Sequence, residues 1–474
     1  MTPTPTIFWF RRDLRLADNP ALLRAVAQGD GVVAPTFIID PAFAAPAGPT
    51  RVGYLRSTLE ALDSSLDGNL IVRLGEPAKE LLALARELGA THIFATADHA
   101  PAGRRRDERV VRFLAAEGVN VSFLDSNYVV APGVVTTKSG SPCQVFGAFR
   151  RGWEHNVRVR PLDAPRSVRW YGARSESLRA LTDNAAKLRP AYFGDLPDTS
   201  VTTIWPAGER AAHERLATFT AVAPSYAEHR DLPGEDATSR LSPFLRFGVL
   251  HPRQVLDAIS ASVGVDRGFE SEICWRDFYA DVLFHRPESV SEVLQPLMAN
   301  LRVDRDRAAV ERFHQWARGE TGYPLVDAGM RQLLSEGWMH NRVRMVTASF
   351  LVKHLHLDWR WGARWFMWRL IDGDVASNQH GWQWTAGTGT DAAPFHRVFN
   401  PSLQARRFDP DGRYVRRYVE PLHSISPPQC LQPGGGDGLF AVAGYCSPIV
   451  DLDRERVEAL ARFEEARTLA RVRS

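Results

Sequence analysis

Residues 7–23 read IFWFRRDLRLADNPALL. The apolar run Ile7–Phe10 has the length of a buried strand. Behind it, Asp18-Asn19-Pro20 offers a capping side chain and a first-turn proline for a helix. The stretch therefore predicts a β-strand, a polar loop and an α-helix, in that order along the chain.

The same alternation continues over the first 128 residues. Further runs of strand length are Val32–Ile39, Leu70–Leu74, His92–Ala95 and Val119–Leu124, and helical patterns between them cover Arg51–Leu62, Pro77–Leu88 and Arg104–Ala116. Strands that alternate with helices pair in parallel and carry helices on both faces. We predict an α/β domain over residues 1–128, built on a five-stranded, Rossmann-like parallel sheet.

The loop Arg11–Leu16 that follows the first strand contains no glycine. The backbone there cannot approach a pyrophosphate closely, which argues against a dinucleotide at the usual place. Ligands of parallel sheets lie beyond the carboxyl ends of the strands, so a different small molecule can still bind at that edge.

A chain of 474 residues exceeds the size of a single hydrophobic core. From Val129 to Ala223 prolines are frequent and no period is sustained, which predicts an interdomain connector over residues 129–223. After Tyr226 the strand signal disappears, and helical periodicity continues to a closing helix at Leu452–Val472. Residues 224–474 are therefore predicted to form an all-α domain.

The net charge of +3 is that of a balanced surface and does not by itself indicate a nucleic-acid partner. No run of about 20 apolar residues is present, and residues 1–6 do not have the pattern of a secretion signal. The cysteines are scattered without a metal-binding spacing, so no metal site is predicted. We expect a monomeric cytoplasmic protein without membrane contact.

Two predicted helices carry unusual mixtures of side chains. One side of the helix that begins near Trp338 presents Asn341, Arg342, Arg344 and Met345. One face of the helix at Phe269–Leu283 presents Glu272, Trp275 and Arg276. Solvated arginines and an ordinary amphipathic edge explain both faces without a ligand. The apolar remainder of the first helix argues against full exposure, and the combined set suits a flat ligand with polar edges, such as a nucleobase.

Two loops leave alternatives open. Asp372-Gly373-Asp374 fits a plain turn or a weak metal loop, although the oxygen ligands of an EF-hand are missing. The hydroxyls of Thr238-Ser239-Arg240-Leu241-Ser242 either cap a helix or hold phosphates. Tryptophans are dense on both sides of the first loop: Trp338, Trp359, Trp361, Trp365, Trp368, Trp382 and Trp384. Core packing explains any one of them, but the density indicates a special use of this part of the chain.

Several longer motifs occur in a recognisable order. They are Phe8-Trp9-Phe10-Arg11-Arg12-Asp13-Leu14-Arg15, Thr238-Ser239-Arg240-Leu241-Ser242, Gly322-Tyr323-Pro324 with Asp327, Trp338-Met339-His340-Asn341-Arg342, and Thr390-Asp391-Ala392-Ala393-Pro394. Together they resemble the photolyase and cryptochrome family, and within it the class I cyclobutane pyrimidine dimer photolyases. The resemblance extends from Ile7 to about Tyr445.

The resemblance implies a reduced FAD in the helical domain. Its phosphates and ribityl chain would be held by Tyr226, Thr238, Ser239, Arg240, Leu241 and Ser242. Asn378 would face the flavin N5, where an amide can accept from the protonated nitrogen without adding charge. Arg344 would pair with Asp372 beside the ring, and Asp374 would lie near N3 and the ribityl side.

The implied reaction is light-driven repair of pyrimidine dimers in duplex or single-stranded DNA, with the dimer flipped out of the stack. Glu272 would hydrogen-bond the pyrimidine edge, Trp275 and Trp384 would pack on the dimer, and Asn341 and Met345 would line the remainder. Phosphates that flank the lesion would contact Arg230, Arg276, Arg342 and Arg397.

One residue departs from the family pattern, and the identity of the antenna pigment is left open. Trp382 and Trp359 match an electron path to the flavin, but Asp306 stands at the third tryptophan position, so Trp361 or Trp316 would have to substitute. The antenna is either 8-hydroxy-5-deazaflavin or methenyltetrahydrofolate. The stretch 98–101 does not distinguish them, whereas Arg51 and Tyr54 favour the deazaflavin by resemblance.

Other functions remain to be separated from repair. A cryptochrome-type blue-light photoreceptor would share the fold but would be expected to alter the dimer-facing residues, which are intact here. A 6-4 photoproduct enzyme would carry a second histidine where Asn341 follows His340. In a different class, a non-catalytic DNA-binding or electron-transfer flavoprotein would bind FAD without repairing DNA in the light.

Overall fold

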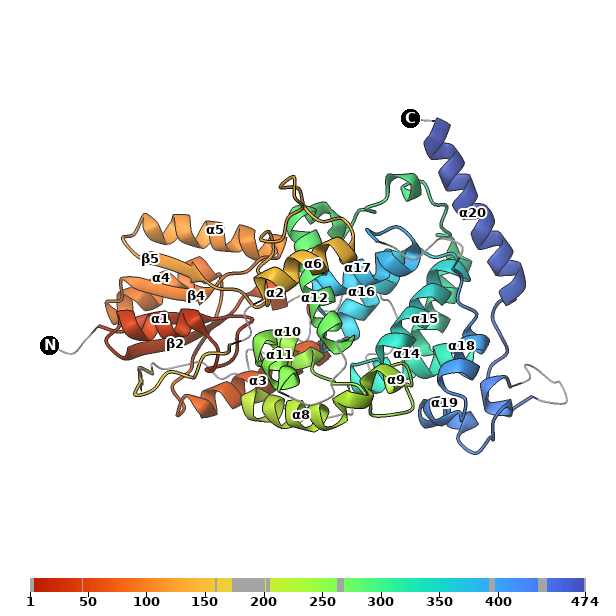
Figure 1. Ribbon diagram of the computed structural model, residues 1–474, viewed down its shortest axis with the longest axis horizontal. Helices are drawn as coiled ribbons and strands as arrows, with labels where there is room; N and C mark the ends of the chain where they lie inside the picture. Colours follow the sequence, from red (N-terminus) through yellow and green to blue (C-terminus); the bar gives the residue numbers. More distant parts are fainter. Residues whose placement is uncertain are drawn as a thin grey trace. The chain divides into compact units, whose positions relative to one another are not determined.

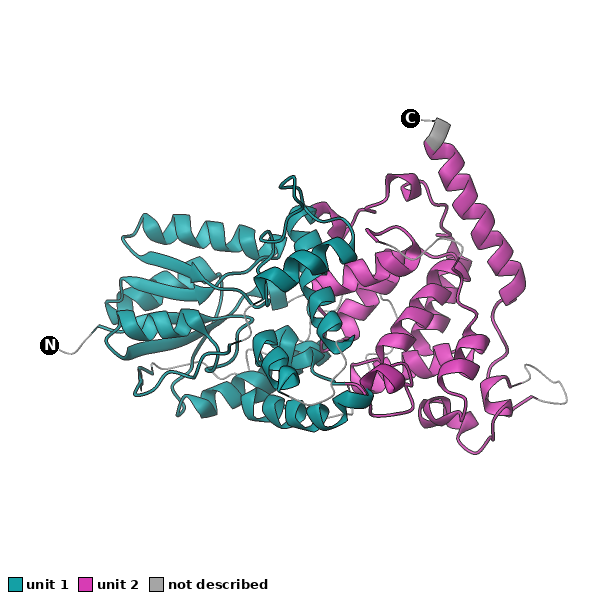
Figure 2. Cartoon of the chain, in the orientation of Figure 1, with its two compact units in different colours: residues 1–190, 205–225, 239–287 teal, residues 191–204, 226–238, 288–474 magenta. Residues whose placement is uncertain are grey.

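The computed structural model describes residues 4–44, 46–157, 160–172, 201, 205–261, 268–391, 397–433 and 441–472. The chain folds into two compact units, which Figure 2 colours separately. Unit 1 comprises residues 1–190, 205–225 and 239–287, and unit 2 comprises residues 191–204, 226–238 and 288–474. The domain boundaries predicted at residues 128 and 223 stay a prediction. Ala392–Pro394, from the last of the quoted motifs, lie outside the described residues.

Unit 1 contains a parallel sheet with the strand order β3-β2-β1-β4-β5; Figure 1 labels its strands β2, β4 and β5. Its strands are β1 (Thr6–Phe10), β2 (Val32–Ile39), β3 (Ile71–Leu74), β4 (His92–Thr96) and β5 (Asn120–Leu124). β1 and β2 are buried at every residue, which explains their continuous apolar runs. The predicted five-stranded parallel sheet is confirmed. A short additional strand, β6 (Arg169–Trp170), pairs with the start of β2, and its two residues are too few to show a period.

Helices complete unit 1. They are α1 (Pro20–Gln28), α2 (Pro41–Ala44), α3 (Pro49–Ser65), α4 (Pro77–Leu88), α5 (Pro101–Ala115), α6 (Phe146–Asn156), α8 (Gly208–Val222), α10 (Ser242–Phe247), α11 (Pro252–Ser260) and α12 (Gly268–His285). Asn19 caps α1 as expected, since its side chain accepts a hydrogen bond from Leu22 N at 3.1 Å. α6 and α8 lie in the range predicted to be a connector without sustained periodicity. α8 buries Gly208, Ala212, Leu216 and Phe219 at helical spacing, but the first two side chains are too small to give a clear apolar pattern, and α6 buries only Phe149 and Trp153.

The loop after β1 joins the sheet to the other helices of unit 1. Arg15 is completely buried, and its guanidinium donates to Asp18 O at 2.9 Å, to Gly248 O at 2.9 Å and to Asn127 Oδ1 at 3.0 Å. Leu14 N donates to the carbonyl at the end of α10 at 3.2 Å. A buried guanidinium without acceptors is strongly destabilising. The arginine-rich loop therefore has a structural role in holding α10 to the sheet.

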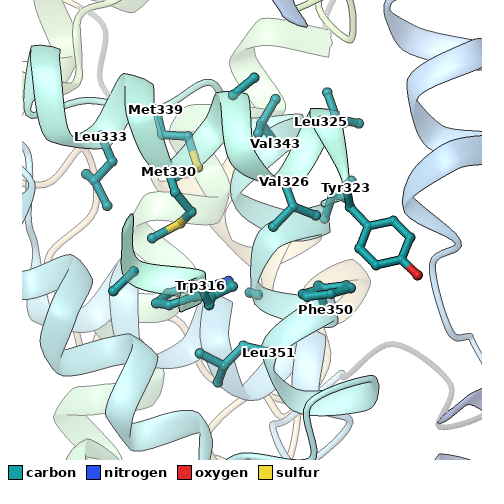
Figure 3. Close-up of a cluster of buried hydrophobic side chains, with 14 of the residues drawn as sticks. Trp316, Tyr323, Leu325, Val326, Met330, Leu333, Met339, Val343, Phe350 and Leu351 are labelled. Carbon is teal, nitrogen blue, oxygen red and sulfur yellow. The ribbon is translucent and has the colours of Figure 1, made fainter. Parts of the chain in front are cut away.

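Unit 2 is helical, as predicted for the C-terminal part of the chain. Its helices are α9 (Tyr226–His229), α13 (Arg307–Arg318), α14 (Pro324–Glu336), α15 (Asn341–Lys353), α16 (Trp359–Arg369), α17 (Val375–Ala386), α18 (Pro401–Phe408), α19 (Arg413–Tyr418) and α20 (Leu452–Val472). Figure 3 shows part of the core, in which Trp316, Met330, Phe350 and Leu351 come from α13, α14 and α15. None of the helices in the described part of the chain is long and apolar enough to cross a membrane.

Asp327 stabilises the Gly322-Tyr323-Pro324 segment that precedes it in the chain. Its buried carboxylate accepts from Thr321 N at 2.8 Å, from Gly322 N at 3.1 Å and from the Tyr445 hydroxyl at 2.7 Å. Gly322 has φ of +77°, and a Cβ there would lie 2.4 Å from Pro448 N. This motif therefore stabilises the start of α14 and its contact with the chain around residues 445–448.

Replacement of Gly248 tests the junction between the β1 loop and α10. Gly248 has φ of +63°, and an added Cβ would lie 1.7 Å from Arg12 O. Gly248→Ala should lower the free energy of unfolding by about 2–4 kcal/mol. Alanine is unfavourable in the left-handed conformation, and its Cβ would also clash with the backbone of Arg12. Urea unfolding measures the change.

Gly68→Ala is the matched control. Gly68 has φ of +76°, but no atom lies within 4 Å of the position of its Cβ. It should cost only about 1 kcal/mol, the conformational part alone. Equal losses in the two variants would contradict the proposed close approach.

Candidate functional site

α12 presents a half-exposed stripe in unit 1. Glu272, Trp275, Arg276 and Tyr279 are partly exposed, whereas Ile273, Cys274, Asp277 and Phe278 are buried. The face predicted for Glu272, Trp275 and Arg276 is therefore present. The Trp275 indole stacks on Phe146 of α6, with ring centroids 3.7 Å apart and planes 5° from parallel. One indole face is thus covered by protein, which fixes the orientation of the ring.

Two buried carboxylates set the rotation of α12. Asp277 Oδ2 accepts from Val130 N at 3.1 Å and from Trp153 Nε1 at 2.9 Å. Asp281 Oδ1 accepts from Gly133 N at 2.7 Å. Burial raises the pKa of Asp277 to about 6. Both carboxylates turn toward residues 130–153, and Glu272 lies on the opposite side of α12.

Arg276 is largely engaged within unit 1. Its Nη1 donates to Asn127 O at 2.8 Å, and its guanidinium carbon lies 4.4 Å from the ring centroid of Tyr128. Asp277 Oδ1 lies 3.6 Å away. These contacts indicate a structural role, and a phosphate at this position would have to share the guanidinium with them.

The segment Ser239–Ser242 forms the entry to α10. Ser239 Oγ accepts from Leu241 N at 3.3 Å, and Ser239 O accepts from Arg215 Nε at 2.8 Å. Arg240 has φ of +50°, a conformation that non-glycine residues seldom adopt, and Leu241 is completely buried. A rare conformation of this kind is a reason to suspect a functional constraint. Thr238 precedes this segment in unit 2, where Tyr226 is 7% exposed.

The N-terminus of α15 brings together several of the predicted side chains of unit 2. His340 caps the helix, its Nδ1 accepting from Arg342 N at 3.2 Å. Asn341 is exposed, and Arg342, Arg344 and Met345 are half-buried, whereas the helix from Val346 onward is buried. Only this first turn and a half is therefore open to a ligand.

Arg344 forms the pair with Asp372 that the resemblance implied. Its Nη2 donates to Asp372 Oδ2 at 2.8 Å, and its Nε donates to Met339 O at 2.8 Å. Asp372 Oδ1 is buried and receives no hydrogen bond from any described residue. A buried carboxylate oxygen normally has a donor, so this atom fits a ligand with an N–H or O–H group.

α17 carries Asn378 in a defined orientation. Asn378 Nδ2 donates to Ala363 O at 3.1 Å and to Gln379 Oε1 at 2.8 Å. Because Ala363 O can only accept, the amide nitrogen must face it, and Oδ1 points the other way. Among the described residues none donates to Oδ1. Asp374 caps α17 by accepting from Ser377 N at 3.1 Å, which gives it a structural role.

The donors and acceptors of unit 2 fit a flavin. Asn378 Oδ1 can accept from a protonated ring nitrogen, and Asp372 Oδ1 can accept from a second N–H or a hydroxyl. The buried Nε1 atoms of Trp359 and Trp382 also have no acceptor in the described part of the chain. No grouping of three metal-ligating side chains occurs among the described residues. The amide oxygen, carboxylate oxygen and indole nitrogens left unpartnered by the described residues suit an organic ligand with polar edges.

Trp382, Trp316 and Trp361 are linked through Phe313 in a continuous path of ring contacts. The Trp382 ring centroid lies 6.1 Å from that of Trp316, which stacks on Phe313 at 5.8 Å. Phe313 in turn contacts the half-exposed Trp361 at 5.6 Å. Asp306, at the position expected for a third tryptophan, caps α13 through Ala309 N at 2.7 Å.

Gly362 was missed by the sequence analysis. A Cβ at this position would lie 2.1 Å from the Trp382 ring, so the indole packs directly on the backbone of α16. The available signal was a lone glycine inside a tryptophan-rich helical stretch, which indicates close packing. Asp231 was missed as well: it pairs with Arg342 across 111 residues, and no local pattern reveals such a contact.

The remaining predicted residues of unit 2 are accessible. Arg230 lies 5.2 Å from the Tyr226 ring centroid, and Trp384 is half-buried. Arg397 is exposed, while its carbonyl oxygen accepts from the buried Lys353 Nζ at 2.8 Å. Burial lowers the pKa of Lys353 to about 8. This contact holds the backbone of Arg397 and leaves its side chain at the surface.

A pocket lies at the carboxyl ends of the strands in unit 1. It is lined by Arg11, Arg12, Thr96, Ala97, Asp98, His99, Asn127 and Tyr128. This is the edge at which a parallel sheet normally binds its ligand. Arg51 and Tyr54, which favoured a deazaflavin by resemblance, are buried, and the Tyr54 hydroxyl donates to Pro206 O at 3.1 Å.

The chain is similar to known proteins over almost its whole length. Residues 6–166 match the family model described as DNA photolyase, and residues 269–465 match the FAD binding domain of DNA photolyase. A deoxyribodipyrimidine photo-lyase from Streptomyces griseus is 40% identical, over 97% of this chain and 98% of the relative.

Two solved structures share the fold. A bacterial class III photolyase from Agrobacterium tumefaciens is 37% identical, with a TM-score of 0.88 over 99% of this chain and 98% of that one. A cryptochrome from Synechocystis is 27% identical, with a TM-score of 0.83 over 97% of this chain and 100% of that one. On the strength of the full-length identity and the two family models, this chain belongs to the DNA photolyase family and has its N-terminal α/β domain and helical FAD-binding domain.

Proposed function

We propose that this protein is a deoxyribodipyrimidine photo-lyase that uses light to split cyclobutane pyrimidine dimers in DNA. The observation that carries the proposal is the orientation of Asn378, whose amide oxygen is directed away from Ala363 and available to a protonated flavin nitrogen. A carboxylate at this position would add a negative charge, whereas an amide stabilises the reduced, protonated ring without one. The full-length similarity to a deoxyribodipyrimidine photo-lyase supports the same conclusion.

The cofactor proposed is reduced FAD. When bound, it supplies one electron on excitation by light and takes the electron back after the dimer has opened. Asn378 Oδ1 would accept a hydrogen bond from the protonated N5, and Arg344 would orient the Asp372 carboxylate through the hydrogen bond between them. Tyr226 and the segment from Thr238 to Ser242 are proposed to hold the phosphates and the ribityl chain.

The substrate proposed is a dimer flipped out of duplex or single-stranded DNA. Glu272 is proposed to hydrogen-bond the pyrimidine edge, and Trp275 and Trp384 to pack on apolar faces of the dimer. Asn341 and Met345 offer an amide and a thioether on the open turn of α15. Arg230, Arg342 and Arg397 are proposed to contact phosphates. Arg276 mainly stabilises the position of α12, because its guanidinium already donates to Asn127 O.

We propose that the protein is a class I photolyase, because the motifs quoted above resemble those of class I. The similar structure from Agrobacterium tumefaciens is named a class III photolyase, so membership of the family does not select the class. An antenna pigment is proposed at the carboxyl edge of the sheet, with 8-hydroxy-5-deazaflavin favoured over methenyltetrahydrofolate. The absorbance spectrum of the purified protein distinguishes the two.

Light-dependent repair is the direct test. The purified, chemically reduced protein should restore intact thymines in single-stranded DNA that carries a thymine dimer under blue or near-ultraviolet light, and not in the dark. Chromatography of the digested DNA measures the recovery. Equal recovery in light and dark would contradict the proposal and favour a photoreceptor or a non-catalytic flavoprotein.

Glu272→Gln tests the contact to the substrate. The amide can keep one hydrogen bond but not the charge, so dimer splitting should slow about 10-fold or more while the flavin content stays unchanged. The quantum yield of splitting and the absorbance of bound flavin are the two measurements. Loss of flavin in this variant would show that Glu272 belongs to the cofactor site.

Trp316→Phe tests the aromatic path. Asp306 stands where the third tryptophan of the electron path is expected, so electrons would have to pass through Trp316. Light-dependent reduction of the oxidised flavin by an external thiol should therefore slow several-fold in this variant. Repair by the chemically reduced protein should not change. The half-exposed Trp170→Phe in β6 is the control. An unchanged photoreduction rate in Trp316→Phe would exclude Trp316 from the path.

A further inference from the structure

Arg342 is held from two sides. Its Nε donates to Asp231 Oδ1 at 3.2 Å and its Nη2 to Asp231 Oδ2 at 2.7 Å, so one edge of the guanidinium is closed on a carboxylate. Its carbon lies 4.5 Å from the ring centroid of Phe408, and its Nη1 lies 4.0 Å from the Met345 sulfur. Nη1 and the outer N–H of Nη2 form the edge that remains for a further acceptor.

Asp231 belongs to a turn that is fixed by its own contacts. Leu232 N donates to His229 O at 2.9 Å, which closes the turn behind α9. Gly234 packs on α19, where an added Cβ would lie 3.3 Å from Tyr414 N. The side chain of Asp231 is 33% exposed and that of Arg342 is 19% exposed. The carboxylate is therefore presented to Arg342 by the backbone and is not a mobile side chain that meets it by chance.

We infer that Asp231 is a positioning residue that makes the Arg342 contact selective. It fixes the guanidinium in one orientation and compensates its charge, so a DNA backbone that merely passes by gains little from Arg342. A phosphate that reaches the remaining edge in the correct geometry still receives two N–H groups. The inference rests on the proposed contact between Arg342 and a phosphate, and it assigns the discrimination against undamaged DNA partly to Asp231.

Salt dependence separates this role from that of an ordinary surface ion pair. Each phosphate that a cation neutralises adds about 0.9 to the slope of log affinity against log salt concentration. If Asp231 neutralises the charge of Arg342, the Asp231→Asn substitution leaves that charge uncompensated. Arg342 then adds one cation that can bind a phosphate of any DNA. An ordinary ion pair would affect stability slightly and would leave this slope unchanged.

The test measures binding of the full-length protein to a labelled duplex, undamaged or with one thymine dimer, between about 50 and 200 mM NaCl. Asp231→Asn should steepen the slope for undamaged duplex by about 0.9 and raise its affinity several-fold at low salt. The affinity ratio of damaged to undamaged duplex should fall. Glu228→Gln, on the same segment and 83% exposed, is the matched control for loss of a charge. Asp231→Ser is a second variant in case the first does not fold.

A double variant shows whether the effect passes through Arg342. In an Arg342→Gln background, Asp231→Asn should change the slope and the affinity no more than Glu228→Gln does. The inference is wrong if Asp231→Asn behaves as Glu228→Gln, or if an effect larger than that of Glu228→Gln persists without Arg342, while Arg342→Gln alone still weakens binding of the damaged duplex. If Arg342→Gln alone leaves binding of the damaged duplex unchanged, the proposed DNA contact is itself wrong, and the inference fails with it.

Discussion

The fold depends on providing acceptors for guanidiniums that are taken out of water. Arg15 is the extreme case, since burial lowers its pKa and its donors end on Asp18, Asn127 and Gly248. These acceptors lie on the loop behind β1, on the chain after β5 and at the end of α10. Because a buried cation without them is strongly destabilising, these three segments must come together whenever Arg15 is buried.

The same constraint sorts the arginines of the candidate site. Arg276 uses its guanidinium on Asn127 O and the Tyr128 ring, and therefore contributes to the position of α12. Arg344 is divided between Met339 O and Asp372, and Arg342 between Asp231 and Phe408. An arginine in a family motif is thus not automatically a ligand contact. Its existing acceptors decide which of its edges a phosphate or a cofactor can reach.

Close packing is the second constraint. Trp382 rests on the backbone of Gly362 and contacts Trp316, and ring contacts continue through Phe313 to the half-exposed Trp361. Asp306 caps α13, which gives a local reason for a carboxylate at that position. Two of the motifs that identify the family, the β1 loop and Gly322 with Asp327, primarily hold the backbone together.

The sequence alone determined the parallel sheet, the helical second part and the faces of α12 and α15, because each follows from a period or a cap within a few neighbouring residues. The residues proposed to contact cofactor and substrate came from the family resemblance, which rests on motifs whose residues are close together in the chain. Only the tertiary structure decided which side chain each arginine meets, which way the Asn378 amide points and where Trp382 finds room. These features join residues as distant as Asp231 and Arg342, and no local pattern encodes a contact between segments that meet only after folding.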